Sequence, residues 1–466
     1  MEAAARLLRE RGVRLVDLDA AADMYLINTC TVTATADHKS RQAVRRARRA
    51  NPHARIVVTG CSVQVDPAAF EVVDPEARLI DNRSKDRLLD ELEAILGLPA
   101  LGDRAAHEDQ RPLPTLSGVE VEGIADDRAS VERTRAFVKV QDGCSFHCTY
   151  CIIPTARGPE RSLAPDTVLA DVRRALAAGH REVVLTGINV GTYDGGWSEP
   201  GPRGSHRRSA LTLAGLVRRI LDETPIERIR LSSIEPQHVD DELIGVWLDG
   251  AGRCLPHFHL PVQSGDDGVL RRMGRRYDTS FYGALVGRLR DAIPGVAIHG
   301  DVIVGFPTED DAAWQRSVRF IEGVDFAGIH VFRYSARPGT PAVRMTGHVD
   351  ERVRKERAAE LLAVAARARS RFAARHVGRE MQVLFETALD DGRWVGHAED
   401  HMLVAARSAD DANLENAIGR VAVSGTDASA PDRAVGRLVT VNAPPRQLRQ
   451  ALPILQTTSS GGTDAR

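Results

Sequence analysis

From Arg135 to Tyr334, short apolar runs alternate six times with helical stretches, and this alternation limits the fold more than any other feature. The runs are AFVKV, EVVLTGI, RIRLSSI, HFHLPV, AIHGDVIVG and FAGIHVFRY, and helical stretches such as Pro165–Ala178 and Leu211–Glu223 separate them. Strands that alternate with helices form parallel sheets. We therefore predict an α/β protein whose centre, residues 134–376, is a six-stranded (βα)6 partial TIM barrel.

Small or polar residues lie at the ends of these predicted strands. They are Thr186, Asn189, Ser232, Glu235, Gln263, Ser264, Asp301, Tyr334 and Ser335. The carboxyl ends of the strands hold the active site in barrels of this kind. Ordinary loop chemistry would explain any one of these residues, but the repetition favours one functional face.

Residues 1–97 predict a separate, smaller parallel α/β domain. The runs YLINTC and RIVVTGC are short strands that each end in a cysteine, and Asp37–Ala54 between them is helical in composition. Cys30 and Cys61 would then both lie at the carboxyl edge of a parallel sheet, where ligands usually bind. The opening segment MEAAARLLRERGVRL has the pattern of an amphipathic helix.

The remaining segments have distinct patterns. Residues 98–133 predict a linker, with a hairpin near Val119–Ile124. A Gly- and Pro-rich insertion from Asp194 predicts a surface loop, and Asp350–Arg379 predicts a long helix. Short strands with Gly and Asp turns in residues 377–442 indicate a small β-barrel, and residues 443–466 have the composition of a flexible tail.

The composition excludes several classes of protein. The net charge is -2 and hydrophobic residues make up 43% of the chain, so any nucleic-acid surface must be local. No apolar run reaches the roughly 18 residues of a membrane span, and the first residues lack the core of a signal peptide. We therefore expect a cytoplasmic protein without a membrane partner, in which neighbouring cysteines are ligands or catalysts rather than disulfides.

Three of the six cysteines, Cys144, Cys148 and Cys151, lie in the motif CSFHCTYC. A structural zinc site needs a fourth ligand, and the nearest candidate, His147, is crowded between the cysteines. A simple electron-transfer cluster also recruits a fourth cysteine. Three thiolates on a cubane cluster would leave one iron open, which is typical of a catalytic metal site. All three possibilities remain, and the third fits the spacing best.

The motif resembles the signature of the radical S-adenosylmethionine (SAM) enzymes. Further segments, including NTCTVT, TGCSVQ, SSIEP, HLPVQSGDDGVLRRM and DVIVGFPTE, are similar to the methylthiotransferase branch of that family over residues 1 to about 440. The resemblance implies a methylthiotransferase N-terminal domain, a radical SAM core and a C-terminal TRAM domain in the place of the small β-barrel. Our default expectation for the oligomeric state is a monomer.

In the family, three cysteines hold a [4Fe-4S] cluster whose open iron binds SAM, and one electron then yields a 5'-deoxyadenosyl radical. The resemblance gives this role to Cys144, Cys148 and Cys151, and it implies a reducing electron donor. Four residues at strand ends are candidate cofactor or substrate contacts, although loop and capping roles would also explain them. They are Ser233, Glu235, Gln263 and Asp301.

The family's N-terminal domain holds a second [4Fe-4S] cluster through three cysteines, and only Cys30 and Cys61 match here. We expect the family's first cysteine to precede this sequence, which would make the domain truncated at its start, with an unpaired sheet edge. The alternative is that the protein lacks one ligand. Cys254, the only spare cysteine, is more typical of a buried core residue. As written, the chain would load one complete cluster and one incomplete cluster.

Two basic stretches point to RNA. Residues 38–55 contain seven Lys and Arg, and Arg352–Arg379 leads into the small barrel; solvated helix faces would also explain them. The motifs VQDGC, LTGINVGTYDGG and YSARPGTPA look most like the threonylcarbamoyladenosine (MtaB-like) group. The resemblance thus implies methylthiolation of C2 of N6-threonylcarbamoyladenosine at position 37, in the anticodon loop of tRNA. The alternatives are isopentenyladenosine 37, a ribosomal protein aspartate, or an RNA-binding protein without activity.

Overall fold

The computed structural model describes residues 8, 13–16, 20–84, 88–96, 115–120, 134–196, 211–408 and 412–444. These divide into two compact units, one within residues 1–129 and the other within residues 130–448. The second unit contains both the predicted barrel region and the small C-terminal barrel.

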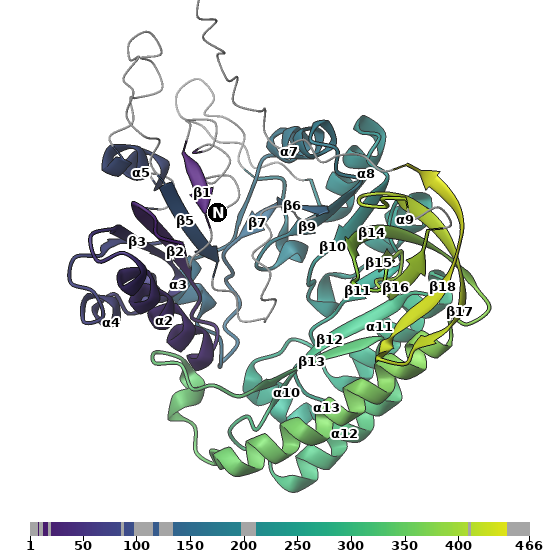
Figure 1. Ribbon diagram of the computed structural model, residues 1–466. Helices are drawn as coiled ribbons and strands as arrows, with labels where there is room; N and C mark the ends of the chain where they lie inside the picture. Colours follow the sequence, from purple (N-terminus) through teal and green to yellow (C-terminus); the bar gives the residue numbers. More distant parts are fainter. Residues whose placement is uncertain are drawn as a thin grey trace, which may run out of the picture. The chain divides into compact units, whose positions relative to one another are not determined.

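The first unit is a five-stranded parallel sheet in the order β1-β5-β2-β3-β4 (Figure 1). Its strands are β1 (Arg14–Val16), β2 (Met24–Thr29), β3 (Arg55–Gly60), β4 (Arg78–Ile80) and β5 (Thr115–Glu120). Its helices are α2 (Ala34–Ala50), α3 (Cys61–Val65), α4 (Ala68–Glu71) and α5 (Leu88–Leu96). The predicted strand–helix–strand order is confirmed, because α2 joins the parallel strands β2 and β3.

Both faces of this sheet are covered, which explains why its strands are continuous apolar runs. Tyr25 and Ile27 of β2 pack with Val44 of α2 on one face. Met24 and Leu26 point to the other face, where they pack with Leu92 of α5. The helix α2 begins at its cap Thr33, whose hydroxyl accepts a hydrogen bond from Ala36 N at 3.1 Å.

Strand β5 corrects two expectations for the segment between the domains. Residues 98–133 are not entirely a linker, because Thr115–Glu120 pairs in parallel with both β1 and β2. Residues 119–120 therefore belong to a parallel sheet rather than to a hairpin, and the rest of the expected hairpin lies outside the described residues. The edge of β2, which we expected to be unpaired, is occupied by β5. The expected opening helix also lies almost entirely outside the described residues.

The second unit contains the six strands that the alternation predicted. They are β6 (Arg135–Lys139), β9 (Glu182–Thr186), β10 (Arg228–Leu231), β11 (His257–His259), β12 (Ala297–Val304) and β13 (Gly328–Arg333). They form two parallel three-stranded sheets, β10-β9-β6 and β11-β12-β13. Parallel bridges between Ile229 and Cys254 and between Ser233 and His259 connect β10 to the β11 segment, as a partial barrel requires.

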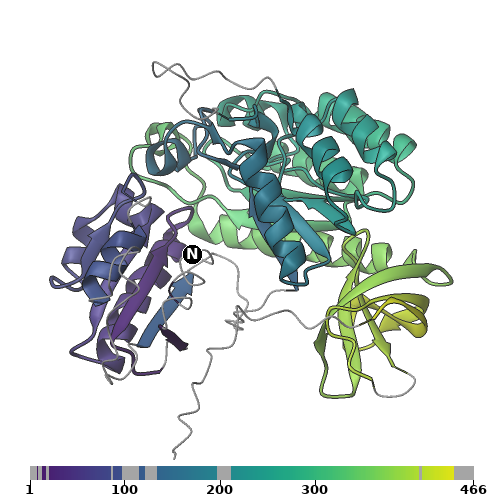
Figure 2. The same ribbon diagram turned by 90° about the horizontal axis from the view of Figure 1, so that it is seen from above.

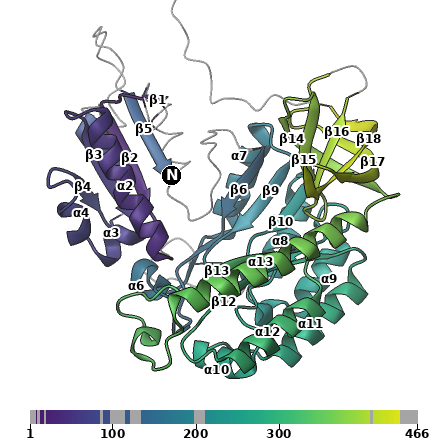
Figure 3. The same cartoon turned by 60° about the horizontal axis from the view of Figure 1, so that its bottom comes forward.

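Helices cover the outside of these strands, and the long helix α13 runs past β12 and β13 toward the C-terminal barrel (Figure 3). The helices are α6 (Ile153–Arg157), α7 (Pro165–Ala177), α8 (Leu213–Glu223), α9 (Asp241–Asp249), α10 (Asp267–Met273), α11 (Thr279–Ala292), α12 (Asp311–Val324) and α13 (Glu351–Ala374). Short elements complete this region: β7 (Gln141–Asp142), β8 (Arg161–Ser162), η2 (Val190–Thr192), η3 (Pro236–His238) and η4 (Pro341–Arg344). Among the described helices, none combines the length and apolar character that a membrane span requires.

The C-terminal part of this unit is a closed barrel, drawn in green and yellow in Figure 2. The order of its strands is β14-β15-β16-β18-β17. Its strands are β14 (Glu380–Ala388), β15 (Arg393–Ala398), β16 (Leu403–Arg407), β17 (Ile418–Asp427) and β18 (Ala430–Ala443). Val383, Phe385, Val404 and Val421 fill its interior together with Phe372 of α13. The five strands agree with those expected from turn spacing.

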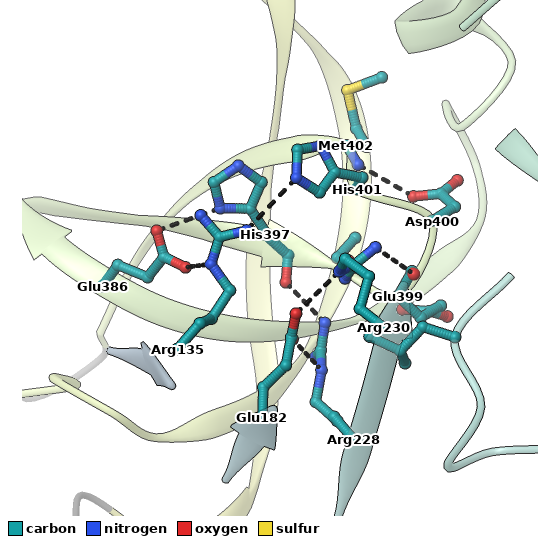
Figure 4. Close-up of polar contacts among 12 residues, drawn as sticks. Arg135, Glu182, Arg228, Arg230, Glu386, His397, Glu399, Asp400, His401 and Met402 are labelled. Atoms are coloured by element: carbon teal, nitrogen blue, oxygen red, sulfur yellow. Dashed lines mark hydrogen bonds and ion pairs between the residues drawn. The ribbon is translucent and has the colours of Figure 1, made fainter. Parts of the chain in front are cut away.

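The small barrel contacts the amino ends of the central strands through buried charges (Figure 4). Glu182, the first residue of β9, forms ion pairs of 2.8 Å with Arg228 and with Arg230 of β10. Both arginines also donate hydrogen bonds to backbone carbonyl groups of the barrel, at distances from 3.1 to 3.3 Å. The opposite, carboxyl ends of the strands are therefore left for the candidate site.

Candidate metal centre

The loop that carries Cys144, Cys148 and Cys151 follows β7 and ends at α6. Its start is a tight turn at Gly143, which has φ of 74°. A Cβ atom on Gly143 would lie 2.0 Å from the carbonyl oxygen of Pro159, so only glycine fits this turn. Cys144 N donates to the carbonyl of Gly158 at 3.0 Å, which closes the neck of the loop.

The centre of the loop is held by the carboxyl end of α10. Thr149 N donates to the carbonyl of Met273 at 2.9 Å, and its hydroxyl donates to the carbonyl of Arg272 at 2.8 Å. Gly274, which has φ of 74°, ends α10 so close to the loop that an added Cβ would lie 3.2 Å from His147 O. The three cysteines are therefore carried by a loop that is fixed at its neck and at its centre.

The environment of the thiols suits a metal cluster. Burial raises the pKa of Cys151 to about 12. Burial also raises the pKa of Cys144, although the Phe146 backbone N–H and Asn189 oppose it. Burial disfavours a charged thiolate in the absence of a counter-charge. A bound metal cation supplies that charge and deprotonates its thiol ligands, so this environment suits a metal cluster. His147, the candidate fourth ligand in the sequence, is exposed.

A network of polar side chains that sequence reasoning missed lies against Cys148. Arg275 Nη1 is 3.4 Å from Cys148 Sγ and 3.3 Å from Tyr150 Oη, and Arg275 Nη2 pairs with Glu235. Burial lowers the pKa of Arg275, but the nearby Tyr150, Tyr277 and Glu235 raise it by more, so the pKa lies well above its ordinary value. Burial raises the pKa of Tyr150 well above its usual value. The structure thus brings the predicted residue Glu235 to the cysteine loop through Arg275.

Of the other predicted residues, Ser233 follows β10 and Gln263 follows β11, whereas Asp301 lies inside β12 rather than at its end. Ser233 forms a parallel bridge with His259, and Gln263 N donates to the carbonyl of Asp301 at 2.8 Å. Asp301 Oδ1 lies 2.8 Å from His259 Nε2 and 3.1 Å from His330 Nδ1. Burial raises the pKa of Asp301, but hydrogen bonds with these two histidines hold it well below its usual range.

His259 and His330 were not singled out from the sequence, because each lies inside a predicted strand. The alternation of side chains along a strand could have found His259, since it shares a face with His257 and precedes the strand end. Ser232 Oγ, at the end of β10, is buried without a hydrogen-bond partner among the described residues. A polar atom of this kind at a strand end fits a site that a cofactor completes.

In the first unit, Cys30 and Cys61 directly follow two neighbouring parallel strands, as expected. Thr29 and Gly60, the last residues of β2 and β3, are register partners. Gly60 has φ of 106°, and an added Cβ would lie 2.3 Å from Thr29 O, so glycine permits this close approach. Asn82 Nδ2 donates to Cys61 Sγ at 3.4 Å, and Ser40 Oγ accepts from Cys30 N at 3.4 Å.

Cys254 is a core residue of the second unit. It is 4% exposed and belongs to the same hydrophobic cluster as Trp247 and Phe258. Burial raises the pKa of its thiol to about 12. This placement agrees with the expectation that Cys254 is a structural residue.

Two family models match the chain. Residues 138–321, which contain the cysteine loop, match the radical SAM superfamily. Residues 1–80, which contain Cys30 and Cys61, match an uncharacterized protein family, UPF0004.

Similar proteins span most of this chain. The threonylcarbamoyladenosine tRNA methylthiotransferase MtaB of Bacillus subtilis is 36% identical over 417 residues, which are 88% of each chain. The protein of the same name from Thermotoga maritima is 34% identical and covers 84% of each chain. The tRNA-2-methylthio-N(6)-dimethylallyladenosine synthase of Maricaulis maris is 34% identical and covers 90% of each chain. Among solved structures, the radical SAM methyltransferase TsrM from Kitasatospora setae covers 73% of this chain and 68% of its own, with 16% identity and a TM-score of 0.48.

Proposed function

This chain belongs to the radical SAM methylthiotransferases, and on that premise we propose that it methylthiolates C2 of N6-threonylcarbamoyladenosine at position 37 of tRNA. The observation that carries the proposal is the similarity to enzymes named for this substrate, of which the Bacillus subtilis protein is 36% identical over 88% of the chain. The fixed loop of three cysteines supports the reaction class, because it leaves a cluster one open position.

We propose that Cys144, Cys148 and Cys151 hold the [4Fe-4S] cluster that binds SAM, and that Cys30 and Cys61 bind a second cluster. When bound, the first cluster and SAM supply the radical that removes hydrogen from adenosine C2, which no side-chain base can do. The protein residues fix the loop at its neck and at its centre. Ser233, Glu235 and Gln263, which follow strands, and Asp301, inside β12, are proposed to contact cofactor or substrate.

We further propose that the closed barrel is a TRAM domain of residues 377–442, which follows a radical SAM core of residues 134–376. The N-terminal domain would extend beyond residue 97 to include β5. We propose that the reaction takes place in the cytoplasm, where tRNA is found. A reducing donor would supply one electron, and the active form would be a monomer.

The helix α2 is the better of the two basic stretches for contact with tRNA. Lys39, Arg45 and Arg49 are exposed on its outer side, where they can meet phosphates. In contrast, the arginines of α13 pair with carboxylates of other elements: Arg357 with Glu309 and Asp311, Arg367 with Glu322, Arg369 with Asp432, and Arg371 and Arg375 with Asp325. Most of the second stretch therefore stabilises the fold.

Mass spectrometry of tRNA nucleosides tests the substrate. Deletion cells are expected to lack the methylthio form of N6-threonylcarbamoyladenosine, and expression of the wild-type chain restores it. The Cys148→Ala variant should not restore it, whereas the matched variant Cys254→Ala should, because Cys254 lies in the core and outside the loop.

Two other outcomes would favour the alternatives. Loss of the methylthio group from isopentenyladenosine alone would move this chain to the group of the Maricaulis maris relative, which is also 34% identical. Loss from a ribosomal protein aspartate with unchanged tRNA would contradict a tRNA substrate.

A further inference from the structure

Arg275 places a buried positive charge against one of the three cysteines. Its Nη1 lies 3.4 Å from Cys148 Sγ, and its side chain is only 2% exposed. A guanidinium group remains charged at any physiological pH. Because burial removes much of the water that would screen this charge, its field acts on the neighbouring sulfur more strongly than the field of a surface charge would.

Three groups hold the guanidinium in this orientation. Arg275 Nη2 pairs with Glu235, which lies between β10 and η3. Arg275 Nε donates to Tyr277 Oη at 3.1 Å, and Tyr277 in turn donates to the carbonyl of Pro261 at 2.6 Å. Tyr150, between Cys148 and Cys151, lies 3.3 Å from Arg275 Nη1. The arginine is therefore positioned by its neighbours and not by the cysteine alone.

Hydrogen bonds to sulfur, net charge and solvent exposure set the reduction potential of an iron–sulfur cluster. Reduction of a [4Fe-4S] cluster adds one electron from a low-potential donor, and no proton or bond changes. The cluster therefore becomes more negative by one charge. A fixed positive charge and an N–H donor at Cys148 stabilise that reduced form more than the oxidised form.

We propose that Arg275 is a positioning residue that raises the reduction potential of the cluster held by Cys144, Cys148 and Cys151, and that Glu235 limits this increase. The inference rests on the proposed role of these cysteines. It gives Glu235 a role that acts through Arg275, since the carboxylate offsets part of the positive charge.

A redox titration of the anaerobically reconstituted protein, followed by electron paramagnetic resonance without SAM or tRNA, tests the proposal. Arg275→Gln is expected to lower the ratio of reduced to oxidised cluster at a given applied potential by about tenfold, or about 59 mV for one electron. Glu235→Gln is expected to change the ratio in the opposite direction. Arg275→Lys keeps the charge but not the fork, so its potential should fall between those of wild type and Arg275→Gln.

Arg276→Gln is the matched control. Arg276 is exposed, and its guanidinium lies over the Phe146 ring at 4.1 Å, so this variant removes the same charge from the same region. Solvent screens an exposed charge, so we expect a much smaller change. Iron content and circular dichroism of each variant establish that it is folded and loaded.

Equal potentials for Arg275→Gln and Arg276→Gln, or shifts of the same sign for Arg275→Gln and Glu235→Gln, would overturn the proposal. If Arg275→Gln does not load iron, Arg275→Lys and Glu235→Gln decide, and a wild-type potential in both would also overturn it. A wild-type protein without a cluster signal would overturn the proposed cysteine role as well. A normal cluster with the expected shifts, but no modified tRNA, would contradict only the proposed substrate.

Discussion

At the scale of single residues, glycine at close backbone contacts decides where the cysteines lie. Gly143 and Gly60 each precede a cysteine, and each has a positive φ. At both positions, an added Cβ would come within 2.3 Å of a backbone carbonyl oxygen. The residue type before each cysteine is therefore determined by backbone geometry and not by the chemistry of the metal.

Gly143→Ala is predicted to destabilise the cysteine loop and reduce its iron content. The added Cβ would lie 2.0 Å from Pro159 O, so the neck of the loop must open. Gly158→Ala is the control, because Gly158 has φ of 79° but open space around its Cβ position. The control should show only the cost of its backbone conformation, φ 79° and ψ -167°, which is about 1–3 kcal/mol for a residue other than glycine. Thermal unfolding and iron analysis measure both effects, and equal iron contents would contradict the role of the steric contact.

At the scale of elements, composition alone does not distinguish a substrate-binding helix from a structural helix. Both α2 and α13 are rich in arginine, and both were candidates for RNA contact. The carboxylates that pair with the α13 arginines come from segments as distant as Glu309 and Asp432. Only the folded chain brings these charges together.

Replacing Arg45 and Arg49 of α2 by glutamine is predicted to weaken tRNA binding and to reduce the salt dependence of the affinity. If each arginine meets a phosphate, the slope of log K against log salt falls by about 1 per residue. The double variant Arg367→Gln, Arg371→Gln is the control in α13, because both residues already pair with carboxylates. Binding titrations at several salt concentrations measure the slopes, and a larger loss in the α13 variant would contradict the assignment.

At the scale of the second unit, a layer of buried charges and histidines joins the small barrel to the amino ends of the central strands. Burial raises the pKa of Glu182, but Arg230 and Arg228 lower it to about 2, so the carboxylate is charged between them. Four imidazole rings lie beside this group, with ring centroids 4.5 to 5.5 Å apart: His257, His299, His397 and His401. Although His257, His299 and His401 have the spacing of metal ligands, Arg135 already lies 3.3 Å from His401 Nε2. We therefore interpret this layer as a packing contact between the small barrel and the central strands.

Glu182→Gln is predicted to destabilise the second unit by about 3–5 kcal/mol, because it leaves two buried arginines without their carboxylate. Glu223→Gln is the control, since Glu223 pairs with Arg173 and Arg219 at the surface, where ion pairs contribute little. Chemical denaturation compares the two variants, and similar unfolding midpoints would contradict the importance of the buried group.

The histidines of this layer predict a loss of stability in mild acid. Burial lowers the pKa of His299 to about 3 and holds the pKa values of His257 and His401 well below their usual value. The unfolded chain therefore binds protons first as the pH falls below about 6.5, so stability decreases from there toward pH 3. Arg135 and Arg230 add positive charge to the same layer, and Glu182 and Glu386 oppose it.

We expect His299→Gln to lose less stability than wild type between pH 7.5 and pH 5, by on the order of 1–2 kcal/mol. The exposed residue His348 provides the control variant, His348→Gln. Thermal unfolding at the two pH values measures the difference. Parallel pH profiles for wild type and His299→Gln would contradict this role of the histidine layer.

The order of apolar runs by itself determined the six central strands, the five strands of the small barrel and the parallel pair that ends in Cys30 and Cys61. These features follow from local periodicity and from turn residues, which a single segment carries. The spacing of Cys144, Cys148 and Cys151 favoured a cluster with one open iron, because three ligands in one loop need no distant partner, and the reaction class came from the resemblance to the family.

Only the tertiary structure decided which distant residues meet. The strand β5 fills the sheet edge from within the expected linker, Arg275 reaches Cys148 across more than one hundred residues, and carboxylates from several elements pair with α13. Such contacts depend on chain segments that are far apart in the sequence. Whether a charged side chain is buried depends on its partners and on its exclusion from water, and the local sequence pattern determines neither of them.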